Sequence, residues 1–192
     1  GDIRALLSAE RTALNFLTHL SGIASMTAAA VVAVAGTSAQ IMCSRKTLPL
    51  LRTLQKYAVR AGGGLNHRMG LDDAVLIKDN HIALAGSLSA AIERAQQAAG
   101  AWIAVEVEVD TLEQLHVALA AGAKLILLDN MDTQQLRQAV TLCQGKAHTQ
   151  ASGGIDFSRL REVAETGVDS IALGYLTHSS KALDIGLDYL DA

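Results

Sequence analysis

The chain alternates between short runs rich in β-branched residues and longer amphipathic stretches rich in Ala and Leu, and this alternation restricts the fold more than any other feature. From Ile103 onward the runs begin roughly every 22 residues, about the length of one strand–helix unit. The runs predict strands at Gln40–Cys43, Ala74–Lys78, Ile103–Val109, Lys124–Leu128, Ala147–Gln150 and Ser170–Leu173. The amphipathic stretches predict helices at Ser8–Ala35, Leu50–Ala61, Ser87–Ala99, Thr111–Ala121, Thr133–Cys143 and Phe157–Thr166, with a short one near Ser179–Asp184.

Successive strand–helix units can build a barrel or an open doubly wound sheet, and the strand ends favour a barrel. No Gly-x-Gly-x-x-Gly follows the first strand, as a dinucleotide-binding sheet would need. Instead, several strands end in a polar residue or a glycine: Lys78, Glu108, Asp129, Ser152 and Gly174. In a barrel these ends converge on one face. We therefore expect an open or incomplete TIM-like α/β barrel of about six strands, with the long N-terminal helix outside the repeat.

The composition narrows the classes of function. The chain has 192 residues, a formal net charge of −3 and only 3% aromatic residues. It lacks the long basic stripe and stacking aromatics of a nucleic-acid groove, and no apolar run reaches the length that a bilayer requires. Cys43 and Cys143 are far apart, as free thiols of a reducing compartment can be. We expect a cytoplasmic protein that binds neither nucleic acid nor membranes.

Positive charge is concentrated in one segment of this mildly acidic chain. Seven of its sixteen Lys and Arg residues fall between positions 45 and 78. Arg52, Lys56 and Arg60 recur at helical spacing, and we interpret them as a solvated helix face. The other basic residues lie at predicted strand ends or after the triplet Gly62-Gly63-Gly64: Arg45, Lys46, His67, Arg68 and Lys78. Arg offers a planar fork for carboxylate or phosphate and Lys a mobile point charge, so this group predicts a pocket for a small, highly anionic ligand.

Three carboxylates are expected to accompany this basic group. Glu106 and Glu108 stand two residues apart in one strand, so both point to the same face. The outer face of a barrel strand is covered by helices, where carboxylates would be costly, so both should point inward. Asp129 ends the next strand. Two interpretations stay open for these groups: a Mg²⁺ site completed by substrate phosphates, or ion pairs with the basic residues.

Two late loops predict phosphate contacts. Ser152-Gly153-Gly154 follows the fifth strand and precedes a helix, and Gly174 follows the sixth strand. Loops at late strand ends, together with helix N-termini, form the phosphate site typical of such barrels. His178 lies beside them and is a candidate phosphate or pyrophosphate ligand, whereas His81 is interpreted as a turn cap.

These residues fall within motifs that resemble the C-terminal domain of quinolinate phosphoribosyltransferases, over essentially all 192 residues. The main motifs are Glu10-Arg11-Thr12-Ala13-Leu14-Asn15, Arg45-Lys46-Thr47, Gly62-Gly63-Gly64, Asn66-His67-Arg68, Leu76-Ile77-Lys78-Asp79-Asn80-His81-Ile82, Val105-Glu106-Val107-Glu108, Leu128-Asp129-Asn130-Met131, Ser152-Gly153-Gly154 and Leu176-Thr177-His178-Ser179. The resemblance implies an open α/β barrel that a smaller N-terminal domain precedes in the family. We expect that domain to be absent here, with an interdomain segment and long helix at 1–36 and the barrel at 37–192.

The resemblance also implies a reaction. Such proteins transfer the phosphoribosyl group of phosphoribosyl pyrophosphate to quinolinate with loss of one carboxylate, giving nicotinate mononucleotide, pyrophosphate and CO₂ for NAD biosynthesis. By resemblance, quinolinate would be held by Arg45, His67, Arg68 and Lys78, and by Arg11 from the second subunit of a homodimer. The implied catalytic residues are Lys46, between the substrates, and Glu108 and Asp129, at the ribose diol and at the Mg²⁺ that arrives with phosphoribosyl pyrophosphate. The phosphates would contact Ser152, Gly153, Gly174 and His178.

The chain departs from the family pattern at three places. Cys43-Ser44 stands for the usual Asp-Thr, Leu50 for the usual Gly and Gln150 for the usual Glu. One alternative is therefore a catalytically silent homologue that still dimerises or binds anions. Another alternative is a relative associated with molybdenum transport. The sequence argues against it, because the chain keeps the phosphoribosyltransferase form of both its Arg-Lys-Thr and its Lys-Asp-Asn-His segments.

Overall fold

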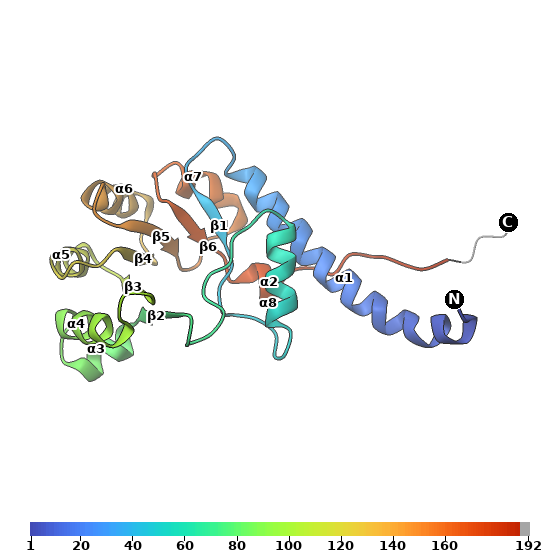
Figure 1. Ribbon diagram of the computed structural model, residues 1–192. Coiled ribbons are helices and arrows are strands. Elements are labelled where there is room, and N and C mark those ends of the chain that lie inside the picture. Colours follow the sequence, from blue (N-terminus) through green and yellow to red (C-terminus); the bar gives the residue numbers. More distant parts are fainter. Residues whose placement is uncertain (189–192) are drawn as a thin grey trace.

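The computed structural model describes residues 1–188 and contains one parallel sheet with helices around it (Figure 1). The strands are β1 (Gln40–Met42), β2 (Ala74–Ile77), β3 (Ala104–Val109), β4 (Leu125–Asp129), β5 (His148–Ser152) and β6 (Ser170–Ala172). The helices are α1 (Ile3–Ala33), α2 (Arg52–Ala61), α3 (Asp79–Ala85), α4 (Leu88–Ala99), α5 (Leu112–Ala120), α6 (Thr133–Cys143), α7 (Leu160–Ala164) and α8 (Tyr175–His178), with a 3-10 turn at Phe157–Arg159. Each predicted strand is present, and no strand end differs from its predicted position by more than two residues.

The order of the strands shows an open barrel. The sheet runs β1-β6-β5-β4-β3-β2, and every neighbouring pair is parallel. Consecutive strands are neighbours from β2 to β6, and β1 then joins β6, as the first strand of a barrel joins the last. Within the described residues β1 and β2 do not pair, so the sheet is not closed. The prediction of an open six-stranded α/β barrel is confirmed.

A loop occupies the open side of the barrel beside β1. The Leu65 amide donates to the carbonyl of Ile41 (2.8 Å) and the Cys43 amide donates to the carbonyl of Leu65 (3.0 Å), so Leu65 extends the free edge of β1 by one short bridge. Just before it, a Cβ at Gly62 or Gly64 would collide with α1, so the triplet lets this loop pack against α1. The triplet therefore has a packing role, and it does not line the cavity described below.

Helices α4 to α7 cover the outer face of the sheet, and Figure 1 shows them in a row along it. Outward-facing side chains of the strands form the core with these helices; Val107, Ile126 and Ile171 are fully buried there. Replacing such a residue by Ala costs about 2–5 kcal/mol in general. The inward-facing side chains can be polar because the barrel is open at its mouth. These polar side chains can therefore line a binding site.

Helix α1 begins five residues earlier than the predicted Ser8, because the Asp2 side chain caps it by accepting from the amide of Arg4. In the described part of the chain it is the one helix long and apolar enough to cross a membrane by length and composition alone, with mean hydropathy 1.5. The prediction that no apolar run reaches that length is therefore wrong. Helix α1 also packs against β1, α2, α7 and α8, which buries Ile23 and Ala30 completely.

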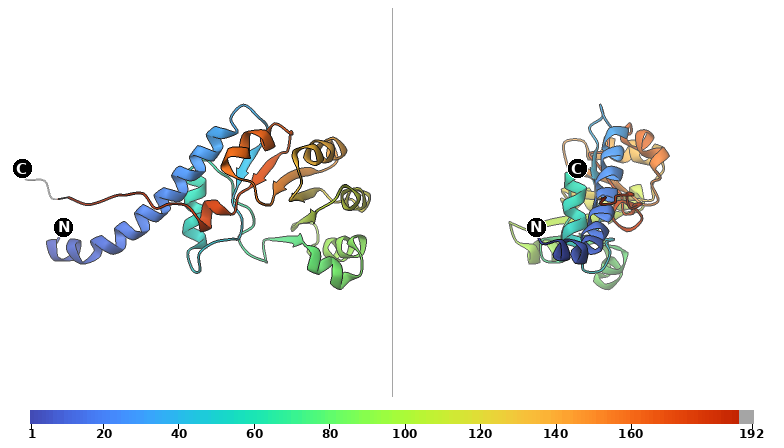
Figure 2. Two further views of the ribbon diagram at one scale, coloured as in Figure 1. Left: turned by 180° about the vertical axis from the view of Figure 1, so that it is seen from behind. Right: turned by 90° about the vertical axis from the view of Figure 1, so that its right-hand side faces the viewer.

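Two short helices differ from the sequence prediction. The helix expected near Ser179–Asp184 is absent, and α8 ends at His178 instead. The following chain runs along α1, where the Leu183 amide donates to the Thr18 carbonyl, and Figure 2 shows it extending with α1 beyond the sheet. Helix α3 was not predicted; its first turn is capped by His81, whose Nδ1 accepts from the Lys78 amide (3.0 Å), which agrees with the capping role expected for His81.

Candidate active site

A cavity of about 740 Å³ lies at the carboxyl ends of the strands. All the predicted site residues except Arg11 line it: Arg45, Lys46, His67, Arg68, Lys78, Glu108, Asp129, Ser152, Gly153, Gly174 and His178. Convergence of strand ends on one face was the reason for predicting a barrel, and the cavity is built in that way. Arg11 lies exposed on the N-terminal part of α1 and is not among the residues that line this cavity.

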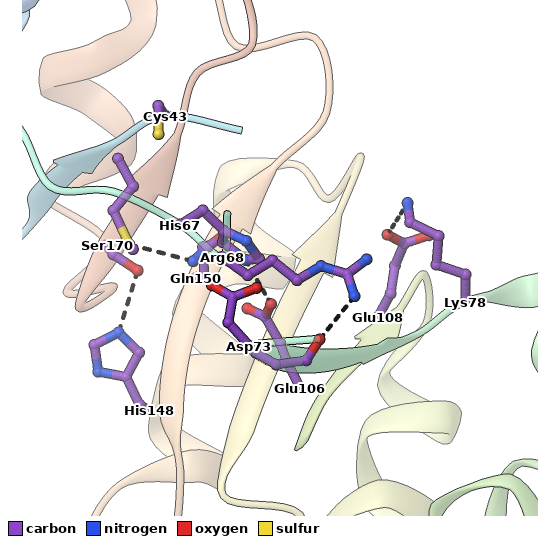
Figure 3. Close-up of polar contacts among 12 residues, drawn as sticks. Cys43, His67, Arg68, Asp73, Lys78, Glu106, Glu108, His148, Gln150 and Ser170 are labelled. Atoms are coloured by element: carbon purple, nitrogen blue, oxygen red, sulfur yellow. Dashed lines mark hydrogen bonds and ion pairs between the residues drawn. The ribbon is translucent and has the colours of Figure 1, made fainter. Parts of the chain in front are cut away.

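One side of the cavity is basic, and we call Arg45, Lys46, His67, Arg68 and Lys78 the cationic wall. Figure 3 shows how part of this wall is held in place. His67 Nε2 lies 2.7 Å from Glu106 Oε2, and Arg68 Nη1 donates to the carbonyl of Ala74 (2.9 Å). Lys78 Nζ donates to Glu108 Oε2 at 2.7 Å. The loop beside β1 thus sends two basic side chains, His67 and Arg68, toward β3 and β2.

Two guanidinium groups of the cationic wall each have one nitrogen without a protein partner. The Nε atoms of Arg45 and Arg68 are buried without a hydrogen-bond acceptor among residues 1–188. Burial first, and then the charge of Arg45, lower the pKa of Arg68 below its usual range. Buried polar groups are normally satisfied, and like charges repel, so this wall is poised for an anion that the protein does not itself supply.

The carboxylates divide between the two interpretations that the sequence left open. Glu106 and Glu108 both point into the barrel as predicted, and each pairs with a basic residue of the cationic wall. Asp129 Oδ2 accepts from Asn130 Nδ2 at 2.7 Å. No group of three or more His, Cys, Asp or Glu suited to a metal exists among the described residues. Glu108 and Asp129 therefore fit Mg²⁺ only if substrate oxygens complete its coordination.

A second part of the cavity lining, after β5 and β6, consists mostly of small, uncharged residues, and we call Ser152, Gly153, Gly154, Gly174 and His178 the glycine wall. This wall adjoins the cationic wall, because Gly174 lies beside Lys46. Asn130 has a positive φ of 53°, and its amide donates to the carbonyl of Ser152 (3.0 Å). Gly153 has a φ of 89°, and a Cβ there would collide with the side chain of Asn130. The backbone is therefore folded tightly at this place, and it can approach a ligand closely because no side chain intervenes.

The interpretation of Arg52, Lys56 and Arg60 as a solvated helix face is wrong for Lys56. Lys56 is 1% exposed, and its Nζ donates to Cys43 Sγ (3.1 Å) and to the His67 carbonyl (2.7 Å). Arg60 is exposed, and Arg52 donates to Thr47 Oγ1 and to the Met69 carbonyl. A signal was available: Lys56 stands three residues before the apolar Val59, so the two share one face of α2.

The three departures from the family pattern have distinct structural settings. Cys43 is fully buried against Lys56. Leu50 is fully exposed at a positive φ of 64°, which is an unfavourable conformation for a side chain of its kind. Gln150 is buried at the floor of the cavity; its Nε2 lies 3.4 Å from Met42 Sδ, and its Oε1 has no partner among the described residues. Gln150 lines the cavity, as does Ser44 of the Cys43-Ser44 departure, whereas Cys43 and Leu50 do not.

Comparison with known proteins gives a consistent result. Residues 23–188 match the family model of the quinolinate phosphoribosyl transferase C-terminal domain. The chain is 50% identical over 188 residues to a probable nicotinate-nucleotide pyrophosphorylase (carboxylating) of Bacillus subtilis, covering 98% of this chain and 65% of that protein. It is 54% identical to the nicotinate-nucleotide pyrophosphorylase (carboxylating) of Mycobacterium leprae, covering 96% of this chain and 66% of that protein.

Solved structures agree with these sequence matches. The crystal structure of NadC from Streptococcus pyogenes is 49% identical, with a TM-score of 0.92, and covers 100% of this chain and 68% of that chain. The crystal structure of the nicotinate-nucleotide pyrophosphorylase of Ehrlichia chaffeensis is 44% identical, also with a TM-score of 0.92, and the match covers 95% of this chain and 66% of that chain. The chain spans about two thirds of the length of these proteins. It belongs to the family of quinolinate phosphoribosyltransferase C-terminal domains.

Proposed function

We propose that this chain carries the catalytic barrel of an enzyme that transfers a phosphoribosyl group to quinolinate and decarboxylates the product to nicotinate mononucleotide. The observation that carries this proposal is that one cavity is lined both by the cationic wall and by the glycine wall. The reaction needs both kinds of surface, because quinolinate is a dicarboxylate and phosphoribosyl pyrophosphate carries a phosphate and a pyrophosphate. The names of the relatives, nicotinate-nucleotide pyrophosphorylases, support the same reaction.

Quinolinate would lie against the cationic wall. Arg45 and Arg68 each have a buried Nε without an acceptor, so a carboxylate would satisfy donors that the protein leaves free. Lys78 and His67 are already paired with Glu108 and Glu106, and these contacts fix the two side chains in position before the substrate arrives. The wall would orient the pyridine nitrogen toward the centre of the cavity, where the ribose would lie.

The ribose and its phosphates would occupy the rest of the cavity. The glycine wall would receive the phosphates on backbone amides and on His178. Lys46 would lie between the two substrates, and Asp129 and Glu108 would face the ribose diol. As pyrophosphate leaves, the ribose carbon becomes cationic, and a nearby carboxylate such as Asp129 stabilises that charge. Mg²⁺, held by substrate oxygens together with Glu108 and Asp129, would neutralise charge on the pyrophosphate.

We further propose that the chain works as a cytoplasmic homodimer in which Arg11 completes the site of the partner subunit. Helix α1 carries exposed apolar side chains along its N-terminal half, including Leu6, Leu7, Phe16 and Leu17. Arg11 lies exposed in the same stretch. Arg11→Ala should weaken quinolinate binding without unfolding the barrel. Sedimentation that shows only monomers across micromolar concentrations would contradict the dimer.

The proposed reaction is tested by mixing the chain with phosphoribosyl pyrophosphate, Mg²⁺ and quinolinate, and measuring CO₂ and pyrophosphate release. We expect release that depends on all three additions, or release that appears when the N-terminal domain of a relative is added. Quinolinate that fails to bind in calorimetry, with the chain folded, would refute the proposal.

The same assay distinguishes the proposed enzyme from a second candidate function, that of a catalytically silent anion-binding homologue. The unpaired Oε1 of Gln150 in the floor of the cavity favours this candidate, because a buried acceptor without a partner is a defect in a site built for binding anions. Such a protein would bind quinolinate and release no pyrophosphate under any of these conditions.

A further inference from the structure

Lys56 is a buried cation behind the cationic wall and has no assigned role. Its side chain is 1% exposed, and it is among the largest fully buried side chains of the protein. Among residues 1–188, no Asp or Glu forms an ion pair with it. A buried charge is costly unless it is paired and hydrogen-bonded, so a lysine at this place needs a physical reason.

The contacts of Lys56 lie at the point where the chain leaves the edge of β1. Leu65 is bonded to β1 through its amide and its carbonyl, and two residues later the His67 carbonyl accepts from Lys56 Nζ (2.7 Å). Cys43 Sγ, at the end of β1, accepts from the same Nζ (3.1 Å). Lys56 thus ties together α2, the end of β1 and the segment that carries His67 and Arg68 into the cavity.

Lys56 does not line the cavity, so it can act only through its neighbours and its charge. An apolar residue of similar size would fill the space, but it would leave the His67 carbonyl without this donor. It would also remove a positive charge that lies in a low-dielectric interior, where charges act over several ångströms. An anion bound between Arg45 and Arg68 would be the natural counter-charge for all of these groups.

We propose that Lys56 is a positioning residue, which fixes the His67–Arg68 segment and adds positive potential behind the wall that binds the dicarboxylate. This proposal rests on the proposed function. It predicts that the residue matters more for quinolinate than for phosphoribosyl pyrophosphate, because Lys56 contacts the segment of His67 and Arg68, whereas the glycine wall follows β5 and β6. It also predicts that the effect survives high salt, since a buried charge is screened much less than an exposed one.

The test compares Lys56→Met with Arg60→Gln, an exposed residue of the same helix that has no contact with the wall. Calorimetry should show quinolinate binding weakened at least about tenfold in Lys56→Met and unchanged in Arg60→Gln. The weakening should persist at about 1 M salt. The KM for phosphoribosyl pyrophosphate should stay within about twofold, and the imidazole NMR signals of His67 should shift.

Unchanged quinolinate affinity in a folded Lys56→Met variant would overturn the proposal. Equal losses for both substrates would also overturn it, because that result indicates general loosening of the barrel. If Lys56→Met does not fold, Lys56→Gln, which keeps a donor, is measured in its place. Failure of both to fold would make Lys56 a residue of the core and end the positioning role. If the wild-type chain does not bind quinolinate, the proposed function fails first and this proposal with it.

Discussion

The cationic wall and the glycine wall line the same cavity and are built in different ways. The cationic wall consists of long side chains held by partners behind them, as His67 is by Glu106 and Lys78 by Glu108. The glycine wall consists of tightly turned backbone at Gly153 and of small residues around it. The two walls therefore depend on different physics, namely charge on one side and backbone geometry on the other.

This difference suggests how one barrel mouth can distinguish two anionic substrates. Guanidinium forks match planar carboxylates, whereas backbone amides close to a ligand suit phosphates. Substitutions in one wall should therefore affect one substrate and leave the other nearly unchanged. The predictions below test that separation.

The largest effect is expected for Arg45→Ala. Losing a desolvated charged donor should weaken quinolinate binding by about 2–5 kcal/mol, with little effect on phosphoribosyl pyrophosphate. Without ligand the variant should be at least as stable as the wild type, because Arg68 loses a like-charged neighbour. Calorimetry and thermal unfolding measure both quantities. Equal affinity of the wild type for quinolinate and nicotinate would contradict the role, since nicotinate lacks the second carboxylate.

The next effect concerns Asp129, which lies between the walls. Asp129→Asn keeps the size of the side chain and can still accept from Asn130, but it removes the negative charge. We expect turnover to fall about 10²-fold while quinolinate affinity changes little, because the charge matters when the ribose becomes cationic. Steady-state kinetics and calorimetry separate the two effects. Unchanged turnover in an active protein would reassign Asp129 to a structural partner of Asn130.

Much of this arrangement could be predicted from the sequence. The strands and their polar ends followed from alternation and spacing, because a parallel barrel places those ends on one face. Lys56 was misplaced because a helical pattern counts lysine as polar; its spacing from Val59 placed it on the apolar face of α2, but the groups that enclose its head group come from tertiary packing. The segment after α8 was misplaced for a similar reason: its extended path depends on contact with α1, far away in the sequence.

The glycine wall is tested by Gly153→Ala against Gly154→Ala. Both residues have positive φ, so each substitution strains the backbone, but only a Cβ at Gly153 meets the side chain of Asn130. Gly153→Ala should therefore raise the KM for phosphoribosyl pyrophosphate roughly tenfold, and Gly154→Ala clearly less. Quinolinate affinity should stay the same in both variants. A parallel loss of quinolinate binding would show that the walls are not independent.

The smallest effect is expected at Leu50, which follows Arg45 and Lys46 in sequence but does not line the cavity. Leu50 has a φ of 64° and is fully exposed, so its side chain is strained without contributing any packing. Leu50→Gly removes that strain, which destabilises the folded state by about 1–2 kcal/mol. Part of this stabilisation is offset, because glycine also increases the conformational entropy of the unfolded chain. We expect the free energy of unfolding to rise by about 1 kcal/mol or less, with quinolinate and phosphoribosyl pyrophosphate binding unchanged. Leu50→Ala is the matched control, because it shortens the side chain and keeps the strain, and it should leave stability nearly unaltered. If Leu50→Gly changed binding at either wall, the loop between Arg45 and α2 would belong to the site, and the comparison of the two walls would have to include it.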